Sequence, residues 1–163
     1  MQDLLEICQE YCSEYCLHFN TKKSKALLFG QFRSLSVAPL LLNDQPIDYV
    51  KEWSYLGTTI VSGNSLSFSI ANDLRSFYRS ANSVISAQRR PNELVQMTLL
   101  YSMSVPILSY AAEVKVLRHK DMHDLNVALN DAIRRIFSFK RWESPRELRQ
   151  QLHRPNIFKI FAS

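Results

Sequence analysis

Three cysteines lie at four-residue intervals near the start of the chain, at Cys8, Cys12 and Cys16. Cysteine thiolates, together with a nearby histidine such as His18, are ligand types that zinc prefers. On a helix, however, Cys8 and Cys16 would lie about 12 Å apart along the axis, whereas sulfurs bound to one zinc ion lie within about 5 Å of each other. The pattern therefore favours small buried side chains on one helical face over a metal site.

Other spacings that could support chemistry are equally incomplete. His119 and His123 have the four-residue spacing of metal ligands on a helix, but no third ligand is identifiable. Asp44 and Asp48 lie beside a turn signal, where a turn role is the simpler interpretation. The sequence has no glycine-rich phosphate loop, no Gly-x-Ser-x-Gly motif and no two adjacent aspartates. Spacing alone therefore predicts no catalytic group.

The charged residues are divided unevenly along the chain. The 163 residues contain 20 Lys and Arg against 15 Asp and Glu, a formal net charge of +5. Residues 1–60 hold five basic against seven acidic residues (net −2), and residues 61–163 hold the other fifteen against eight (net +7). A basic second half is typical of a protein that binds a polyanion, because each neutralised phosphate releases counterions. A solvated basic face is the alternative.

The composition is that of a folded protein, with 46% hydrophobic and 21% charged residues. No apolar run is long enough to predict a transmembrane helix, and the first residues lack the basic and apolar regions of a secretory signal. The odd number of closely spaced cysteines does not indicate a disulfide framework. We therefore expect an intracellular protein of the nucleus or cytoplasm, neither secreted nor bound to a membrane.

Hydrophobic periodicity predicts an α+β first half, residues 1–62. An amphipathic helix ending near residue 16 carries apolar residues at three- and four-residue spacing. Short apolar runs at 25–29, 40–42 and 49–60 predict antiparallel strands including a hairpin. Gly57, inside the last run, suggests a bulge or a close backbone approach.

The second half, residues 63–163, is predicted to be an all-helical bundle. Pro106 should kink or break one of its helices, and Ser144 with Glu147 forms a capping-box pattern. The expected helices lie at about 66–88, from Pro91 onward, at about 120–137 and at 145–152, with a short one opening at Pro155.

Four segments, taken in order, resemble reverse transcriptases of non-LTR (LINE-type) retrotransposons. Residues 17–30 contain the pattern Leu-x-x-Asn-x-x-Lys-Ser and then an apolar strand, and this combination resembles motif D of the palm. Residues 53–60 contain Tyr-Leu-Gly, which looks like the primer-grip hairpin. Residues 100–113 resemble a thumb helix that usually reads Pro-x-Leu-x-Tyr-Gly-x-Glu, although alanine stands where glycine is common. Residues 130–136 are similar to the arginine-containing thumb helix that follows.

The resemblance implies roles for particular residues. Lys23 matches the motif D lysine, which lies near the incoming triphosphate and would stabilise charge on the leaving pyrophosphate. Without the resemblance, an exposed lysine at a strand edge is the simpler interpretation of Lys23. Tyr55, Leu56 and Gly57 match the primer grip, where glycine lets the backbone approach the primer; an ordinary buried hairpin is the alternative.

The resemblance also implies a partner, an RNA–DNA or RNA template–primer duplex whose backbone the thumb follows. Trp142 and Phe139 could stack on a base or pack in the core. The basic residues expected to contact phosphates are Arg75, Arg79, Arg89, Arg90, Arg134, Arg135, Lys140 and Arg141.

Reverse transcriptases bind two metal ions through aspartates of motifs A and C, both of which precede motif D. None of the 163 residues matches these aspartates. We therefore expect no polymerase activity from this chain alone, no cofactor bound to it (Mg²⁺ acting only in a complete enzyme) and no small-molecule substrate. Two other functions stay open: a helical protein–protein interaction module derived from a retroelement, and a small enzyme that depends on Lys23.

Overall fold

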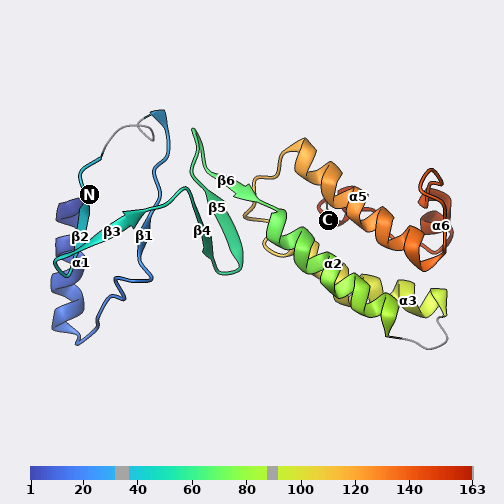
Figure 1. Ribbon diagram of the computed structural model, residues 1–163, viewed down its shortest axis with the longest axis horizontal. Coiled ribbons are helices and arrows are strands. Elements are labelled where there is room, and N and C mark those ends of the chain that lie inside the picture. Colours follow the sequence, from blue (N-terminus) through green and yellow to red (C-terminus); the bar gives the residue numbers. More distant parts are fainter. Residues whose placement is uncertain (32–36, 88–91, 163) are drawn as a thin grey trace. The chain divides into compact units, whose positions relative to one another are not determined.

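The computed structural model describes residues 1–31, 37–87 and 92–162, which divide into two units (Figure 1). The first, Met1–Phe68, holds most of the strand residues and one long helix, and the second, Ser69–Ser163, is built almost entirely from helices. The predicted α+β class with a helical C-terminal region is therefore confirmed. The boundary predicted between residues 62 and 63 precedes the observed division.

The first unit opens with helix α1 (Gln2–Glu14), which ends before Cys16 adopts a positive φ of 54°. The Gln2 side chain bonds to strand β2 (Leu40–Leu42) in both directions: its Nε2 donates to the Leu41 carbonyl (3.2 Å) and its Oε1 accepts from the Leu41 N–H (2.9 Å). No residue of α1 is buried, and Cys16 beyond its end is exposed, so the burial predicted for the three cysteines is wrong. The helix leaves an exposed apolar stripe, the α1 stripe, formed by Leu4, Ile7, Tyr11 and Tyr15.

Strands β1 (Lys25–Ala26), β2 and β3 (Gln45–Tyr49) form one sheet in the order β1-β3-β2. β2 and β3 are antiparallel, and Asn43 and Asp44 join them in a tight turn with positive φ at both residues. β1 pairs with β3 in parallel, which differs from the antiparallel pairing predicted for the strands.

β1 is also shorter than the strand predicted at 25–29, because the residues that follow it bond elsewhere. The Leu28 carbonyl accepts from the Ser62 hydroxyl, and the Gly30 N–H donates to the Gly63 carbonyl over 2.9 Å. These bonds attach the end of the predicted strand to the connection between the last two strands of the second sheet.

The second sheet has the order β4-β5-β6, from β4 (Glu52–Tyr55), β5 (Thr58–Val61) and β6 (Ser67–Ser69). β4 and β5 pair in a continuous antiparallel register that ends at Tyr55 opposite Thr58. Leu56 and Gly57, with φ of 46° and 76°, are therefore the two turn residues of a tight hairpin. The bulge predicted at Gly57 is wrong, because a turn of two residues leaves no extra residue in the ladder.

The second unit packs its helices around one apolar core. α2 (Ala71–Ser86) begins later than the predicted residue 66, because the preceding residues form β6, where the Ser67 hydroxyl donates to the Val61 carbonyl (3.1 Å). α5 (His119–Ile136) agrees closely with the prediction of 120–137. The buried core includes Phe77, Ala81, Met97, Leu100, Leu108, Leu125, Leu129, Ile133 and Ile157.

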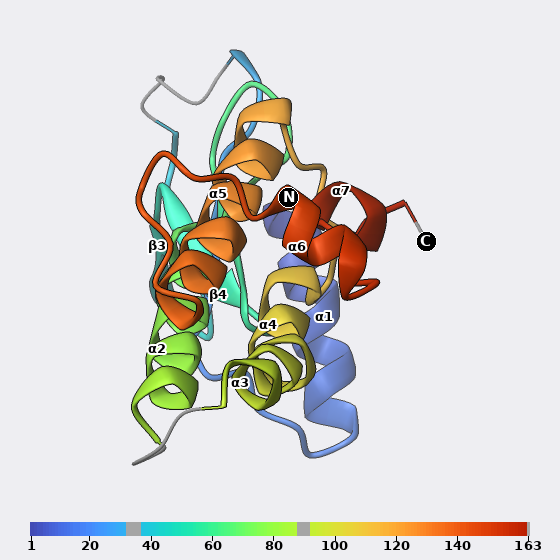
Figure 2. The same ribbon diagram turned by 90° about the vertical axis from the view of Figure 1, so that its right-hand side faces the viewer.

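Pro106 does not break the helical path. α3 (Glu93–Leu99) continues through a π-helical segment, η2 (Leu100–Ser104), into α4 (Val105–Ser109), without interruption (Figure 2). A proline has no N–H and its ring clashes with the carbonyl four residues earlier, and the wider π turn accommodates both effects. Of the kink or break predicted at Pro106, the break does not occur, because the helical path continues through η2 into α4.

Two predicted helix starts differ in detail. Pro91 lies outside the described residues, and α3 is capped by Asn92, whose Oδ1 accepts from the Leu94 N–H (3.0 Å) and the next N–H. α6 (Arg146–Gln151) is preceded by Pro145 as its N-cap, so Glu147 is one position too early to complete a capping box with Ser144. α7 (Ile157–Ile160) follows Pro155, as predicted.

Candidate nucleic-acid interface

The exposed face of α2 carries two of the predicted arginines in line. Arg75 and Arg79 are four residues apart, and Asn82 follows three residues later, so all three lie on one side of the helix. All three are exposed. Arg75 Nη1 donates to the Asn72 side chain (3.3 Å), and the described residues offer Arg79 no hydrogen-bond acceptor. The sequence spacing therefore predicted this face correctly.

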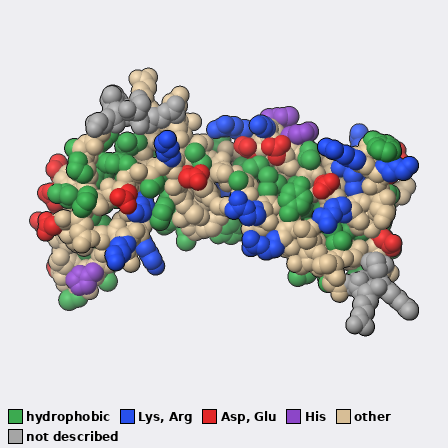
Figure 3. All heavy atoms as spheres, in the orientation of Figure 1, with side chains coloured by type: hydrophobic (Ala, Val, Ile, Leu, Met, Phe, Trp, Pro, Cys, Tyr) green, Lys and Arg blue, Asp and Glu red, His purple; other side chains and the backbone are tan. Residues whose placement is uncertain are grey.

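Arg135 on α5 joins this face from a neighbouring helix. Its Nη1 donates to the Asn82 Oδ1 over 2.5 Å, across the contact between α2 and α5. We call Arg75, Arg79 and Arg135 the α2–α5 arginine stripe. Figure 1 shows the two helices running alongside each other, and Figure 3 shows Lys and Arg side chains across the helices of the second unit.

One acidic residue lies beside the stripe. Burial, followed by the negative charge of Asp131, raises the pKa of Tyr78 on α2, while Arg135 opposes that shift. Asp131 and Arg135 therefore both lie near Tyr78, with opposite effects on its pKa.

A second group of predicted residues lies in the loop after α5. Arg134 Nε donates to the Glu143 carbonyl (2.8 Å), and the Glu143 carboxylate accepts from the Lys140 N–H (2.7 Å), which together hold the loop against the end of α5. Lys140 Nζ lies 5.5 Å from the centre of the Trp142 ring, and Arg141 is exposed beside them. Arg134 is thus a structural residue as well as a cation, a role that spacing did not indicate.

The two aromatic residues of this loop differ in exposure. Trp142 is 80% exposed, so its ring is accessible to a base. Phe139 is half-buried, with its ring 6.0 Å from that of Phe137. Phe139 thus lies beside Phe137, which packs against the core, and base stacking stays a prediction for both aromatic residues.

The predicted primer-grip residues occupy the tip of the β4–β5 hairpin. Tyr55 is 61% and Leu56 73% exposed, while Thr58 and Thr59 on the returning strand are buried. Positive φ at Leu56 and Gly57 keeps the backbone tight at this tip. The hairpin therefore projects two large apolar side chains from a fixed base.

Lys23 and two of the arginines complete the predicted set. Lys23 is exposed in the turn before β1, where its N–H donates to the Asn20 carbonyl (3.0 Å) and to the Asn20 side chain (3.1 Å). The turn is therefore held by Asn20, the asparagine of the motif D pattern. Arg89 and Arg90 lie outside the described residues.

The described part of the chain offers no obvious metal ligands. Cys8, Cys12 and Cys16 are free thiols, and no three His, Cys, Asp or Glu residues gather there as a metal site would require. Asp44 lies in the β2–β3 turn, as predicted, and Asp48 pairs with Lys25 over 2.5 Å. These residues therefore do not fit the two-metal centre that the family resemblance implies. Among the described helices, none has the length and apolar character needed to cross a membrane.

Two groups of charged residues were not predicted from spacing. Lys115 and Asp73 form a buried ion pair, and four cations at 146–159 line a pocket beside α6 and α7. The first joins positions 42 residues apart, which no local pattern reveals. The second has a weak local signal, the density of basic residues in the last eighteen positions.

Comparison with protein-family models, curated proteins and solved structures finds no match to this chain. The functional assignment is therefore argued from the motif resemblance and from the geometry described above.

Proposed function

We propose that the chain is the C-terminal palm and thumb portion of a LINE-type reverse transcriptase, and that it grips an RNA–DNA or RNA template–primer duplex. The observation that supports this most strongly is the α2–α5 arginine stripe. Three guanidinium groups from two helices lie on one exposed surface, in the segment where the resemblance expects a thumb.

The stripe suits a phosphate backbone. From Arg75 to Asn82, where Arg135 is bound, the helix rises about 10 Å, which lets successive cations meet successive phosphates of one strand. Arginine forks bind phosphate oxygens through two parallel hydrogen bonds. Because such contacts do not read bases, the grip would hold any duplex sequence.

The other predicted residues take supporting roles in this proposal. Tyr55 and Leu56 would contact the primer from the hairpin tip, and Trp142 would stack on an unpaired base. Lys23 would act beside the incoming triphosphate. Because the sequence has no adjacent aspartates, we propose that the Mg²⁺-binding groups come from another stretch of polypeptide and that this chain alone does not polymerise DNA. We place the protein inside the cell, in the nucleus or cytoplasm.

The α1 stripe supports the palm part of the proposal. An exposed row of Leu4, Ile7, Tyr11 and Tyr15 is unusual unless another surface covers it. The rest of a palm would provide that surface. The same stripe also favours the second candidate function, a protein–protein interaction module.

A binding measurement separates the two candidates. Fluorescence anisotropy of a labelled RNA–DNA hybrid should show binding that weakens steeply as salt rises. A primed RNA template with Mg²⁺ and deoxynucleotides should not be extended, by the wild type or by Lys23→Ala. Absence of hybrid binding at low salt would overturn the proposal, and extension of the primer would overturn the claim that another stretch of polypeptide supplies the Mg²⁺-binding groups. Another metal- or cofactor-dependent activity, lost in Lys23→Ala, would instead support a small enzyme.

A further inference from the structure

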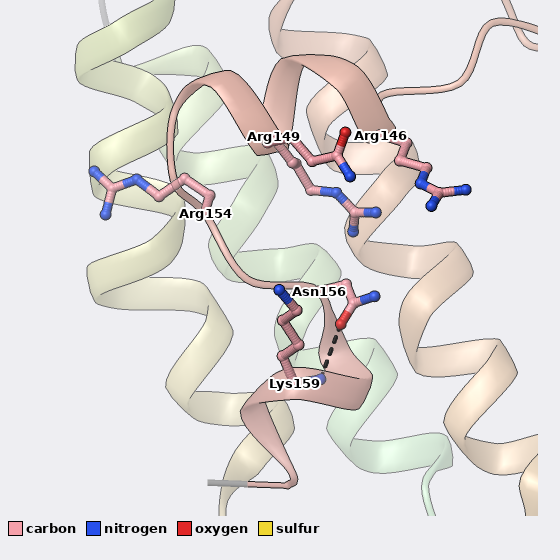
Figure 4. A pocket seen from close by; sticks show the side chains of 6 residues that line it. Arg146, Arg149, Arg154, Asn156 and Lys159 are labelled. Carbon is pink, nitrogen blue, oxygen red and sulfur yellow. Dashed lines mark hydrogen bonds between the residues drawn. The ribbon is translucent and has the colours of Figure 1, made fainter.

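Four cations gather on the last two helices, away from the arginine stripe in sequence. Arg146 and Arg149 belong to α6, Arg154 to the connecting segment and Lys159 to α7. Together with Gln150 and Asn156 they line a pocket of about 430 Å³ (Figure 4). The six lining residues include no carboxylate, and Glu147, the acid within α6, lines a neighbouring hollow with Glu143, which shares Arg146 with this pocket.

Arg149 is the unusual member of this group. It is only 8% exposed, and among the described residues its Nη1 has no hydrogen-bond partner. Burial lowers the pKa of Arg149, and the nearby Arg146 lowers it further against the influence of Tyr101. A buried guanidinium nitrogen without an acceptor is unfavourable in a folded protein, so Arg149 is suited to bind an anion.

The surrounding residues hold the pocket in shape. The Tyr101 hydroxyl donates to the Pro155 carbonyl (2.7 Å), and the Arg154 guanidinium lies 5.4 Å from the centre of the Tyr101 ring. Arg154 Nη2 also donates to the Thr98 hydroxyl (3.1 Å). The segment between α6 and α7 is thus fastened to α3 and η2, and a ligand would meet a preformed site.

Two of the four cationic side chains extend into the middle of the pocket (Figure 4). Arg149 and Lys159 extend into the space between α6 and α7, while Arg146 and Arg154 extend to either side (Figure 4). The Asn156 Oδ1 accepts from the Lys159 N–H (2.9 Å), which leaves the amide nitrogen as the donor of that side chain. The four cationic side chains of the pocket are hydrogen-bond donors, and the amides of Asn156 and Gln150 each have an NH₂ donor as well.

We propose that this pocket binds a phosphate monoester, with Arg149 as the buried anchor and Lys159 as the second cation. A monoester carries close to two negative charges at neutral pH, which matches converging cations better than a singly charged phosphodiester. The volume exceeds that of one phosphate group, since a water molecule occupies about 30 Å³, so the ligand can extend beyond its phosphate. None of the six residues belongs to the proposed duplex grip, so the two proposals can fail separately.

The test titrates the purified chain with inorganic phosphate, against chloride at matched ionic strength, by calorimetry and thermal shift. Phosphate should bind saturably and raise the melting temperature, and chloride should do neither. Because a charge-assisted hydrogen bond contributes to each cation's contact, Arg149→Met and Lys159→Gln should each weaken phosphate binding at least about tenfold. Lys120→Gln and Lys22→Gln, which remove exposed charges outside the pocket, should leave phosphate affinity unchanged.

Lys159→Gln keeps the test decisive if Arg149→Met fails to fold, because Lys159 is exposed. Two oligonucleotides of one sequence, with a 5′-phosphate and a 5′-hydroxyl, identify the source of the phosphate. Tighter binding of the phosphorylated strand, lost in Lys159→Gln, assigns the pocket to a nucleic-acid end; equal binding with retained phosphate affinity assigns it to a small phosphorylated compound. Equal effects of phosphate and chloride, or equal losses in the pocket and control variants, would overturn the proposal.

Discussion

Removal of Lys115 should destabilise the second unit more than removal of any exposed charge. Lys115 Nζ lies 2.7 Å from the Asp73 Oδ2, and the two side chains are only 2% and 10% exposed. Asp73 lies in the first turn of α2, where a negative charge is also favoured by the helix dipole. Lys115 lies between α4 and α5, so the pair fastens that connection to the start of α2.

The magnitude follows from the geometry. Two unit charges 2.7 Å apart attract by about 6 kcal/mol at an effective dielectric constant of about 20, and desolvation of both groups offsets part of this. Breaking a buried pair by removing one partner typically lowers stability by about 3–5 kcal/mol, because the other charge is left buried and uncompensated. Since domains are stable by about 5–15 kcal/mol, Lys115→Met should remove a large share of the total.

Urea unfolding followed by circular dichroism measures the loss. Lys115→Met should lower the unfolding free energy by about 3–5 kcal/mol, and the double variant Lys115→Met, Asp73→Leu should recover most of it. Lys120→Met, at an exposed position of α5, is the matched control and should change stability by less than about 0.5 kcal/mol. A loss below about 1 kcal/mol in Lys115→Met, or a double variant no better than the single, would refute this reasoning.

Three further predictions concern stability. Burial raises the pKa of Tyr101 to about 12, against about 10 for an unfolded tyrosine. The contribution of Tyr101 to folding stability is therefore complete below about pH 10 and is lost as the pH rises toward 12. Tyr101→Phe should make the melting temperature fall less steeply with pH across that window. Asn92→Ala should lower the unfolding free energy by about 1 kcal/mol in urea, because α3 loses its cap, whereas Lys120→Ala, at an exposed position of α5, should change it by less than about 0.5 kcal/mol. Gly57→Ala should lower it by about 1–2 kcal/mol, because an L-residue is strained at a φ of 76°, and an unchanged urea midpoint would contradict the turn geometry.

Local patterns were sufficient wherever one helix face meets the core. The apolar spacing along α2 and α5 predicted both helices, because residues three and four apart lie on one side whatever that side packs against. The same rule placed Arg75 and Arg79 together. A tight turn at Asn43 and Asp44 was likewise readable, because these residue types tolerate positive φ.

Features that depend on distant partners were not predictable. β1 pairs in parallel with a strand that follows a long connection, and only the folded chain shows that Leu28 and Gly30 bond to residues 62 and 63 instead. The π-helical turn before Pro106 depends on how α3 and α4 both pack against α2. Hydrophobic periodicity describes one helix or strand at a time and does not predict which elements pair or pack together.

The candidate site shows the same division. The spacing of Arg75 and Arg79 was visible in the sequence, but the contact that brings Arg135 to them joins residues 53 apart. Arg134 was expected only to contact phosphate, and the structure adds a second role, because its side chain holds a loop through the Glu143 carbonyl. Arg149 was missed because a buried arginine is recognised by its surroundings and not by its neighbours in sequence.

The most direct test of the duplex grip is the salt dependence of hybrid binding in a variant that removes two exposed arginines without disturbing packing. Arg79 and Arg141 suit this purpose, since both are exposed and neither donates a hydrogen bond to another described residue. In the double variant Arg79→Gln, Arg141→Gln, the slope of log affinity against log salt should become shallower by about two, because each lost phosphate contact removes about 0.9 from the slope. The control Lys120→Gln should keep the wild-type slope. An unchanged slope in the double variant, with circular dichroism showing an intact fold, would contradict the account.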